Sequence, residues 1–143
     1  MKKILLIISF IFILTSCTSG RKTTVMELNM NNEKYNEILE FFNSIDENEE
    51  ISGIIKGEEN YTLIFNNPKF KIDKVKVDYS SDLMKINLQG EDSEKEPIKI
   101  YNIILGDDYR KNIDTESKNH SVVVERSGKE IKTVIIDALN MED

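Results

Sequence analysis

The spacing of apolar residues predicts one amphipathic helix over residues 31–48. Apolar side chains recur there three or four positions apart, which places them in a single stripe along a helix. The residues of this stripe are Tyr35, Ile38, Leu39, Phe42 and Ile45. Asn31 or Asn32 can cap the start of the helix, and the acidic cluster at 46–50 opposes the helix dipole and so ends it.

From residue 51 onward, apolar and polar residues alternate, which is typical of strands with one buried face. The expected strands are 51–56, 61–65, 70–79, 83–88, 98–105, 120–125 and 130–137. The first two flank a turn and form a hairpin. In 70–79 the apolar positions change parity after Ile72, so Asp73 or Lys74 should mark a β-bulge or a tight bend. Residues 24–30 suit a short strand or an ordered lead-in.

The turn between the last two expected strands can take two forms. A three-residue turn with Gly128 in the left-handed region places Glu125 opposite Lys129. A two-residue turn places Glu125 opposite Glu130, and like charges in that position destabilise a sheet. We therefore expect the three-residue turn.

These elements predict an α+β fold, because the alternation of strands and helices that marks a parallel sheet is absent. The expected architecture is one N-terminal amphipathic helix packed on an antiparallel sheet of about six strands. The alternative is a small β-barrel or sandwich with an N-terminal helix. Both form a single globular domain over residues 25–143.

The first twenty residues follow the order of an export signal. Lys2 and Lys3 precede an apolar run over 4–14, and small polar residues follow it. The run is shorter than the roughly 20 residues of a membrane-spanning helix, so a retained span is disfavoured. Cleavage after Ser16 by an ordinary signal peptidase would place Leu14 where a small residue is preferred.

The end of this segment, Leu14, Thr15, Ser16 and Cys17, resembles the lipobox of bacterial lipoproteins. The resemblance implies that a peptidase recognises the first three residues and cuts just before the cysteine. It also implies that the Cys17 thiol carries a diacylglycerol, because a thiol is a good soft nucleophile. Residues 1–16 would then be a signal peptide and 17–24 the lipidated cysteine and its tether. An ordinary signal or a short membrane anchor with a chance cysteine is the alternative.

Lipid attachment predicts a protein on the cell membrane or outer membrane, facing the envelope or the exterior. It also accounts for the single cysteine, which cannot form an internal disulfide. Loss of Lys2 and Lys3 shifts the formal net charge from −7 to −9. Such a surface repels nucleic acid, so we exclude nucleic-acid binding.

The predicted order of elements looks like that of small cystatin-like and NTF2-like lipoproteins. The inhibitory cystatin motif, Gln-x-Val-x-Gly, is missing, because the only glutamine, Gln89, is followed by Gly90. The resemblance therefore implies no inhibition of cysteine proteases.

Catalytic and metal-binding patterns are weak. His120 is the only histidine, and Ser121 beside it lacks the Gly-x-Ser-x-Gly pattern of a hydrolase nucleophile. Four carboxylates fall in the polar insert at 106–119, but their spacing does not match a calcium-binding loop. They are Asp107, Asp108, Asp114 and Glu116. We therefore expect no metal, no cofactor and no enzymatic activity.

The sequence favours a membrane-anchored binding or interaction module whose partner is an unknown protein or small molecule. An inhibitor or immunity-type protein is the alternative, and a small envelope hydrolase that uses carboxylates is the weaker one. Loops carry function disproportionately, so the insert at 106–119 is the candidate contact surface. Within it, Tyr109 and Arg110 are the candidate partner contacts.

Overall fold

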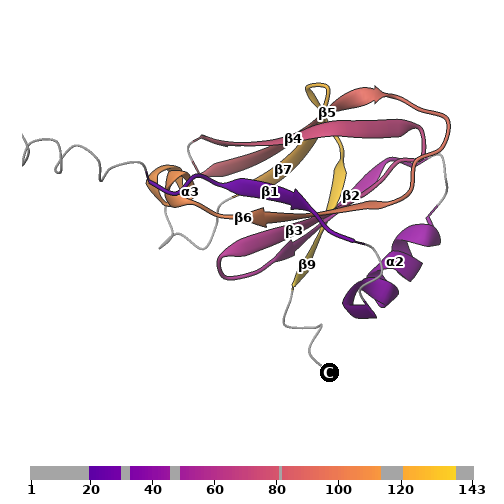
Figure 1. Ribbon diagram of the computed structural model, residues 1–143, viewed down its shortest axis with the longest axis horizontal. Helices are drawn as coiled ribbons and strands as arrows, with labels where there is room; N and C mark the ends of the chain where they lie inside the picture. Colours follow the sequence, from indigo (N-terminus) through magenta and orange to yellow (C-terminus); the bar gives the residue numbers. More distant parts are fainter. Residues whose placement is uncertain (1–19, 30–32, 46–48, 81, 114–120, 138–143) are drawn as a thin grey trace, which may run out of the picture.

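The computed structural model describes residues 20–29, 33–45, 49–80, 82–113 and 121–137. These residues form two β-sheets with short helices (Figure 1). Sheet A has five strands in the order β1 (Thr24–Glu27), β6 (Lys99–Ile104), β3 (Asn60–Asn66), β2 (Ile51–Lys56) and β9 (Lys132–Asp137). Sheet B has four, in the order β4 (Phe70–Ser80), β5 (Leu83–Asp92), β7 (Ser121–Arg126) and β8 (Lys129–Glu130). The helices are η1 (Glu33–Tyr35), a 3₁₀ turn, and the α-helices α2 (Asn36–Asn43) and α3 (Asp107–Asn112).

The inner faces of the two sheets enclose the main core. Alternate residues of β3 and β6 face it from sheet A, and alternate residues of β4, β5 and β7 face it from sheet B. Its fully buried members include Leu63, Ile103, Ile86 and Val124. Sheet A is therefore buried on this face by sheet B.

On the opposite face of sheet A, α2 packs over part of a second hydrophobic cluster, so this sheet lies between two clusters (Figure 1). Phe42 is fully buried there, against Ile51, Ile64 and Ile100 of the sheet. The apolar stripe predicted for the helix is confirmed, since all five of its residues belong to this cluster. The α-helix itself is shorter than predicted, with bounds Asn36–Asn43.

The predicted fold class is wrong. The described residues are mostly β, arranged in two sheets of five and four strands instead of one antiparallel sheet of about six. Two of the strand pairs, β2 with β9 and β5 with β7, are parallel. The barrel or sandwich alternative also carried an N-terminal helix, whereas the first described element is the strand β1. Alternation along a strand shows which face is buried, but it does not show which sheet the strand joins.

Two local predictions are confirmed. Strands β2 and β3 form an antiparallel hairpin, with Ile54 opposite Leu63. Strand β4 changes register against β5 between Ile72 and Lys74, so Asp73 is the extra residue of the predicted bulge. The bulge keeps Phe70 and Ile72 on the same buried face as the later apolar residues of β4.

The predicted length of the turn between β7 and β8 is wrong, whereas the left-handed backbone predicted for Gly128 is confirmed. Glu125 lies opposite Glu130, so the turn has two residues, Ser127 and Gly128. Both have positive φ, 52° and 78°, which is the backbone of the two-residue hairpin turns that match strand twist. The like-charge argument fails because Lys85, on the neighbouring strand β5, forms an ion pair with Glu125 at 2.9 Å.

Candidate functional site

The residues just before β1 are held by the start of α3. The Asp107 carboxylate accepts a hydrogen bond from the Arg21 backbone N–H at 2.8 Å, and the Asp107 N–H donates to the Arg21 carbonyl at 2.7 Å. Asp108 accepts from the Thr23 N–H at 2.9 Å and from its hydroxyl at 2.8 Å. We call these contacts the N-terminal clamp. Residues 21–23, which were expected to belong to the tether, are therefore bound to the domain.

Gly106 makes this close approach possible. A Cβ atom at this position would collide with the backbone of residues 21–23. The Gly106 N–H also donates to the Thr23 hydroxyl oxygen at 3.1 Å. A side chain at residue 106 would therefore force the N-terminal segment away from α3.

Three tyrosines pack behind the clamp. The Tyr109 ring meets the rings of Tyr61 and Tyr79 edge to face, with centroids 6.5 and 5.5 Å apart. The Tyr79 hydroxyl lies 2.8 Å from the Thr23 hydroxyl oxygen. Burial raises the pKa of Tyr79 to about 12. Burial, followed by the hydrogen bond with Tyr109, raises the pKa of Tyr61 well above its ordinary value, so both phenols keep their protons to a higher pH than an exposed tyrosine does.

The two candidate partner contacts occupy different environments. Tyr109 is only 9% exposed, because it joins the tyrosine cluster on the inner side of α3. Arg110 is exposed and forms an ion pair with Glu59 at 3.4 Å. The partner contact itself stays a prediction, and Arg110 is the residue of the two that a partner could reach.

Several predicted residues lie outside the described residues. These are the lipobox residues Leu14, Thr15, Ser16 and Cys17, and also His120, Asp114 and Glu116. Within the described ranges, no group of three or more His, Cys, Asp or Glu residues could hold a metal ion. No helix of that part of the chain is long and apolar enough to span a membrane.

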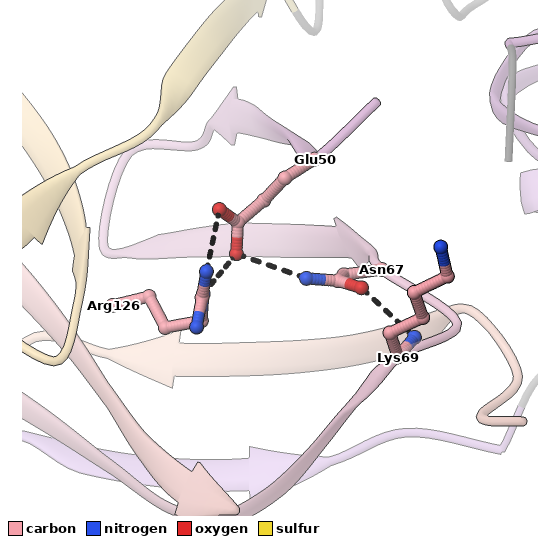
Figure 2. Close-up of polar contacts among 4 residues, drawn as sticks. All are labelled: Glu50, Asn67, Lys69 and Arg126. Carbon is pink, nitrogen blue, oxygen red and sulfur yellow. Dashed lines mark hydrogen bonds and ion pairs between the residues drawn. The ribbon is translucent and has the colours of Figure 1, made fainter. Parts of the chain in front are cut away.

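A second polar network lies at the other end of the strands (Figure 2). Glu50, just before β2, accepts hydrogen bonds from the Arg126 guanidinium at the end of β7. It also accepts one from the Asn67 side chain at 3.1 Å, and Asn67 in turn accepts from the Lys69 backbone N–H at 2.9 Å. The Arg126 guanidinium stacks 5.0 Å from the centre of the Phe70 ring. Since Glu50 leads into sheet A and Arg126 belongs to sheet B, the network ties the two sheets together.

A cleft of about 590 Å³ opens beside this network. It lies between the end of α2, the β3–β4 turn and the loop after β5. Its lining combines buried apolar side chains with amides and charged groups, namely Phe42, Asn43, Ile45, Asn66, Pro68, Lys69, Glu94, Lys95, Glu96, Pro97 and Ile98. Two backbone hydrogen bonds, from Ser93 to Lys69 and from Glu96 to Pro68, hold the loop in place. This arrangement can bind a ligand by shape and hydrogen bonds.

Figure 1 shows α3 at one end of the molecule and α2 near the other. The clamp is formed by the start of α3 and the cleft is lined by the end of α2, so the two lie at opposite ends. The sequence does not predict the clamp, because Asp107 and Asp108 lie in a polar stretch where their carboxylates indicate only possible metal ligands. One signal for it was present: Gly106 directly precedes two acids, and acidic residues suit the start of a helix.

Comparison with known proteins found no matching family model, no matching curated protein and no matching solved structure.

Proposed function

We propose that this protein is a lipoprotein, anchored to the cell membrane or outer membrane by a diacylglycerol on Cys17, whose domain is a non-enzymatic binding module. The proposal starts from the lipobox pattern Leu14-Thr15-Ser16-Cys17 and from the absence of a second cysteine in the sequence. Two acyl chains give stable anchoring, where a single chain binds a membrane only marginally.

The N-terminal clamp is the observation that carries the proposal furthest. Arg21 is bound to Asp107, and it follows Cys17 by four residues. Four extended residues span at most about 14 Å. An anchor on Cys17 would therefore hold the α3 end of the domain close to the membrane and direct the α2 end, with its cleft, away from it.

The non-enzymatic part of the proposal is supported by composition. A chain with one histidine and one cysteine, the latter used for lipid attachment, has few groups for nucleophilic catalysis. The cleft beside α2 offers binding groups of mixed polarity. Binding a partner on the side away from the membrane is therefore the activity that the geometry supports best.

The test is a Cys17→Ser variant of the full chain in a bacterial host fed radiolabelled palmitate. We expect loss of the label and the appearance of uncleaved or released protein. Thr18→Ser is the matched control, because it changes the neighbouring residue and keeps the lipobox. Unaltered labelling of the Cys17→Ser variant would refute the proposal.

A further inference from the structure

The four outer strands of the two sheets are not equally protected. Exposed strand edges attract other strands, and proteins protect them by short length or by charged side chains. Strand β1 has four residues, and β8 has two, both charged. The long strand β4 carries exposed charged side chains, namely Lys71, Asp73, Lys74, Lys76 and Asp78.

Strand β9 has charged residues only at its ends, Lys132 and Asp137. It is six residues long, and its central residues 133–136, Thr-Val-Ile-Ile, carry no charge. Among the described strands, only β2 pairs with it, so its other side has no strand partner within that part of the chain. Ile135 is 51% exposed. This is the composition of an edge that accepts another strand.

A groove runs beside the same edge. It has a volume of about 330 Å³ and is lined by Val122, Glu130, Ile131, Lys132, Thr133 and Ile135. Val122 and Ile131 are buried and give it apolar walls. A strand edge without a strand partner among the described residues, beside a side-chain pocket, supplies the two components of peptide recognition by strand addition. In that mode the backbone supplies affinity and the pocket supplies specificity.

We infer that the outer edge of β9 binds an extended apolar segment of a partner protein by β-strand addition. Alternate side chains of that segment enter the groove beside Ile135. Because Val134 and Ile136 lie on the other face of the sheet, the segment is expected to be apolar on both faces at its centre.

The area of this edge favours a peptide segment over a second copy of the chain. At about 3.3 Å per residue, six residues make an edge about 20 Å long. An edge of that length and about 10 Å deep buries roughly 200 Å², well below the roughly 800 Å² per partner of a stable interface between folded proteins. A flexible peptide can pair along this edge and also place its side chains in the groove, whereas the β9 strand of a second copy is held in its own sheet by β2.

The direction of β9 gives a second argument, which rests on the proposed lipid anchor. Symmetric pairing of two copies through β9 would be antiparallel, and it would point their α3 ends in opposite directions. Two copies anchored through Cys17 to one membrane have their α3 ends on the same side.

The test uses the full-length chain in detergent and a defined probe. The probe is a fluorescein-labelled peptide with a central run of four valines, which is apolar on both faces of a strand, and with a lysine at each end. We expect saturable binding, slower hydrogen exchange of the β9 amides when the peptide is bound, and at least tenfold weaker binding by Ile135→Lys. Met26→Lys is the matched control, because Met26 is 48% exposed on the edge strand β1, and it should bind like the parent.

A second probe separates strand pairing from simple apolar adhesion. The same peptide with N-methyl groups on alternate residues keeps its side chains but loses backbone donors, and we expect it not to bind. Ile135→Thr keeps a β-branched residue at the edge and should bind the peptide with intermediate affinity. This variant replaces Ile135→Lys in the test if Ile135→Lys unfolds.

Equal binding of both peptides, or of parent and both Ile135 variants, would overturn the inference. Efficient disulfide crosslinking between copies of Ile135→Cys in membranes would overturn the choice of partner and assign the edge to a second copy. Failure of the lipid-anchor proposal is distinguishable from failure of this inference. In that case palmitate labelling would be the same in the parent and in Cys17→Ser, while peptide binding stayed intact.

Discussion

Asp108 accepts two hydrogen bonds from Thr23, one from the backbone N–H at 2.9 Å and one from the hydroxyl at 2.8 Å. Through this contact, a helix late in the sequence fixes the point at which the chain enters the domain. The clamp therefore decides how far the folded domain can move from anything attached to the preceding residues.

Replacement of Asp108 by alanine should release the N-terminal segment. We expect a loss of about 1–3 kcal/mol in the free energy of unfolding, because two hydrogen bonds to a charged group are removed. Hydrogen exchange of residues 21–27 should become faster, while exchange in sheet B stays unchanged. The matched control is Asp92→Ala, at an exposed carboxylate at the end of β5. Equal exchange in the two variants would show that the clamp does not hold the segment.

The ion pair between Glu50 and Arg126 should contribute more to stability than the pair between Glu59 and Arg110. The side chains of the first pair are 22% and 30% exposed, whereas those of the second are 79% and 66% exposed. In double-mutant cycles with Glu→Gln and Arg→Met, we expect a coupling of about 1 kcal/mol for the first pair. The second should give less than about 0.5 kcal/mol, since solvent screens exposed pairs. Denaturant unfolding measures both, and equal couplings would contradict the sheet-linking role.

Alkaline pH should destabilise the fold through the buried tyrosines. The ordinary tyrosine pKa is about 10, and burial raises the pKa values of Tyr79 and Tyr101 to about 12. Folding therefore favours the protonated phenols, and their contribution is complete below pH 10 and lost as the pH rises toward 12. Urea unfolding at several pH values, together with the absorbance of phenolate, measures this loss.

Tyr79→Phe provides the control for that experiment. The variant lacks one titrating group, so its stability should fall less steeply above pH 10 than that of the parent. It also lacks the hydroxyl contact with Thr23, so its stability at neutral pH should be lower. Identical slopes above pH 10 would show that Tyr79 titrates equally in the folded and unfolded states.

Phe42 should be the side chain that holds α2 on sheet A. It is fully buried, while its neighbour Phe41 is 50% exposed. Phe42→Ala should cost about 3–5 kcal/mol in the free energy of unfolding, and Phe41→Ala should cost much less. Thermal or urea unfolding of the two variants makes the comparison, and similar losses would contradict the assignment of α2 to the second cluster.

The sequence was sufficient for features that depend on neighbouring residues. The helix stripe through Phe42 and the bulge at Asp73 both follow from the spacing of apolar residues within one segment. The same spacing places Tyr61 and Leu63 on one face of β3, and both are buried in the core between the sheets.

Features that depend on distant residues could not be predicted. The predicted length of the turn at 127–128 was wrong because Lys85, which is far away in the sequence, forms an ion pair with Glu125. The two-sheet arrangement depends on parallel pairs between β2 and β9 and between β5 and β7, and alternation alone does not identify strand partners. Tyr109 sits in a polar stretch, yet it is buried because α3 folds back onto Tyr61 and Tyr79.

The pairing of β2 with β9 also constrains the order of folding. Ser52 and Thr133 share a hydrogen bond across 81 residues of sequence, so sheet A gains its last strand only after nearly the whole chain is available. The hairpins β2–β3 and β4–β5 are local and can form early, whereas both parallel pairs require the closure of long loops. During synthesis from the N-terminus onward, both sheets are therefore completed late, when strands β7 to β9 become available.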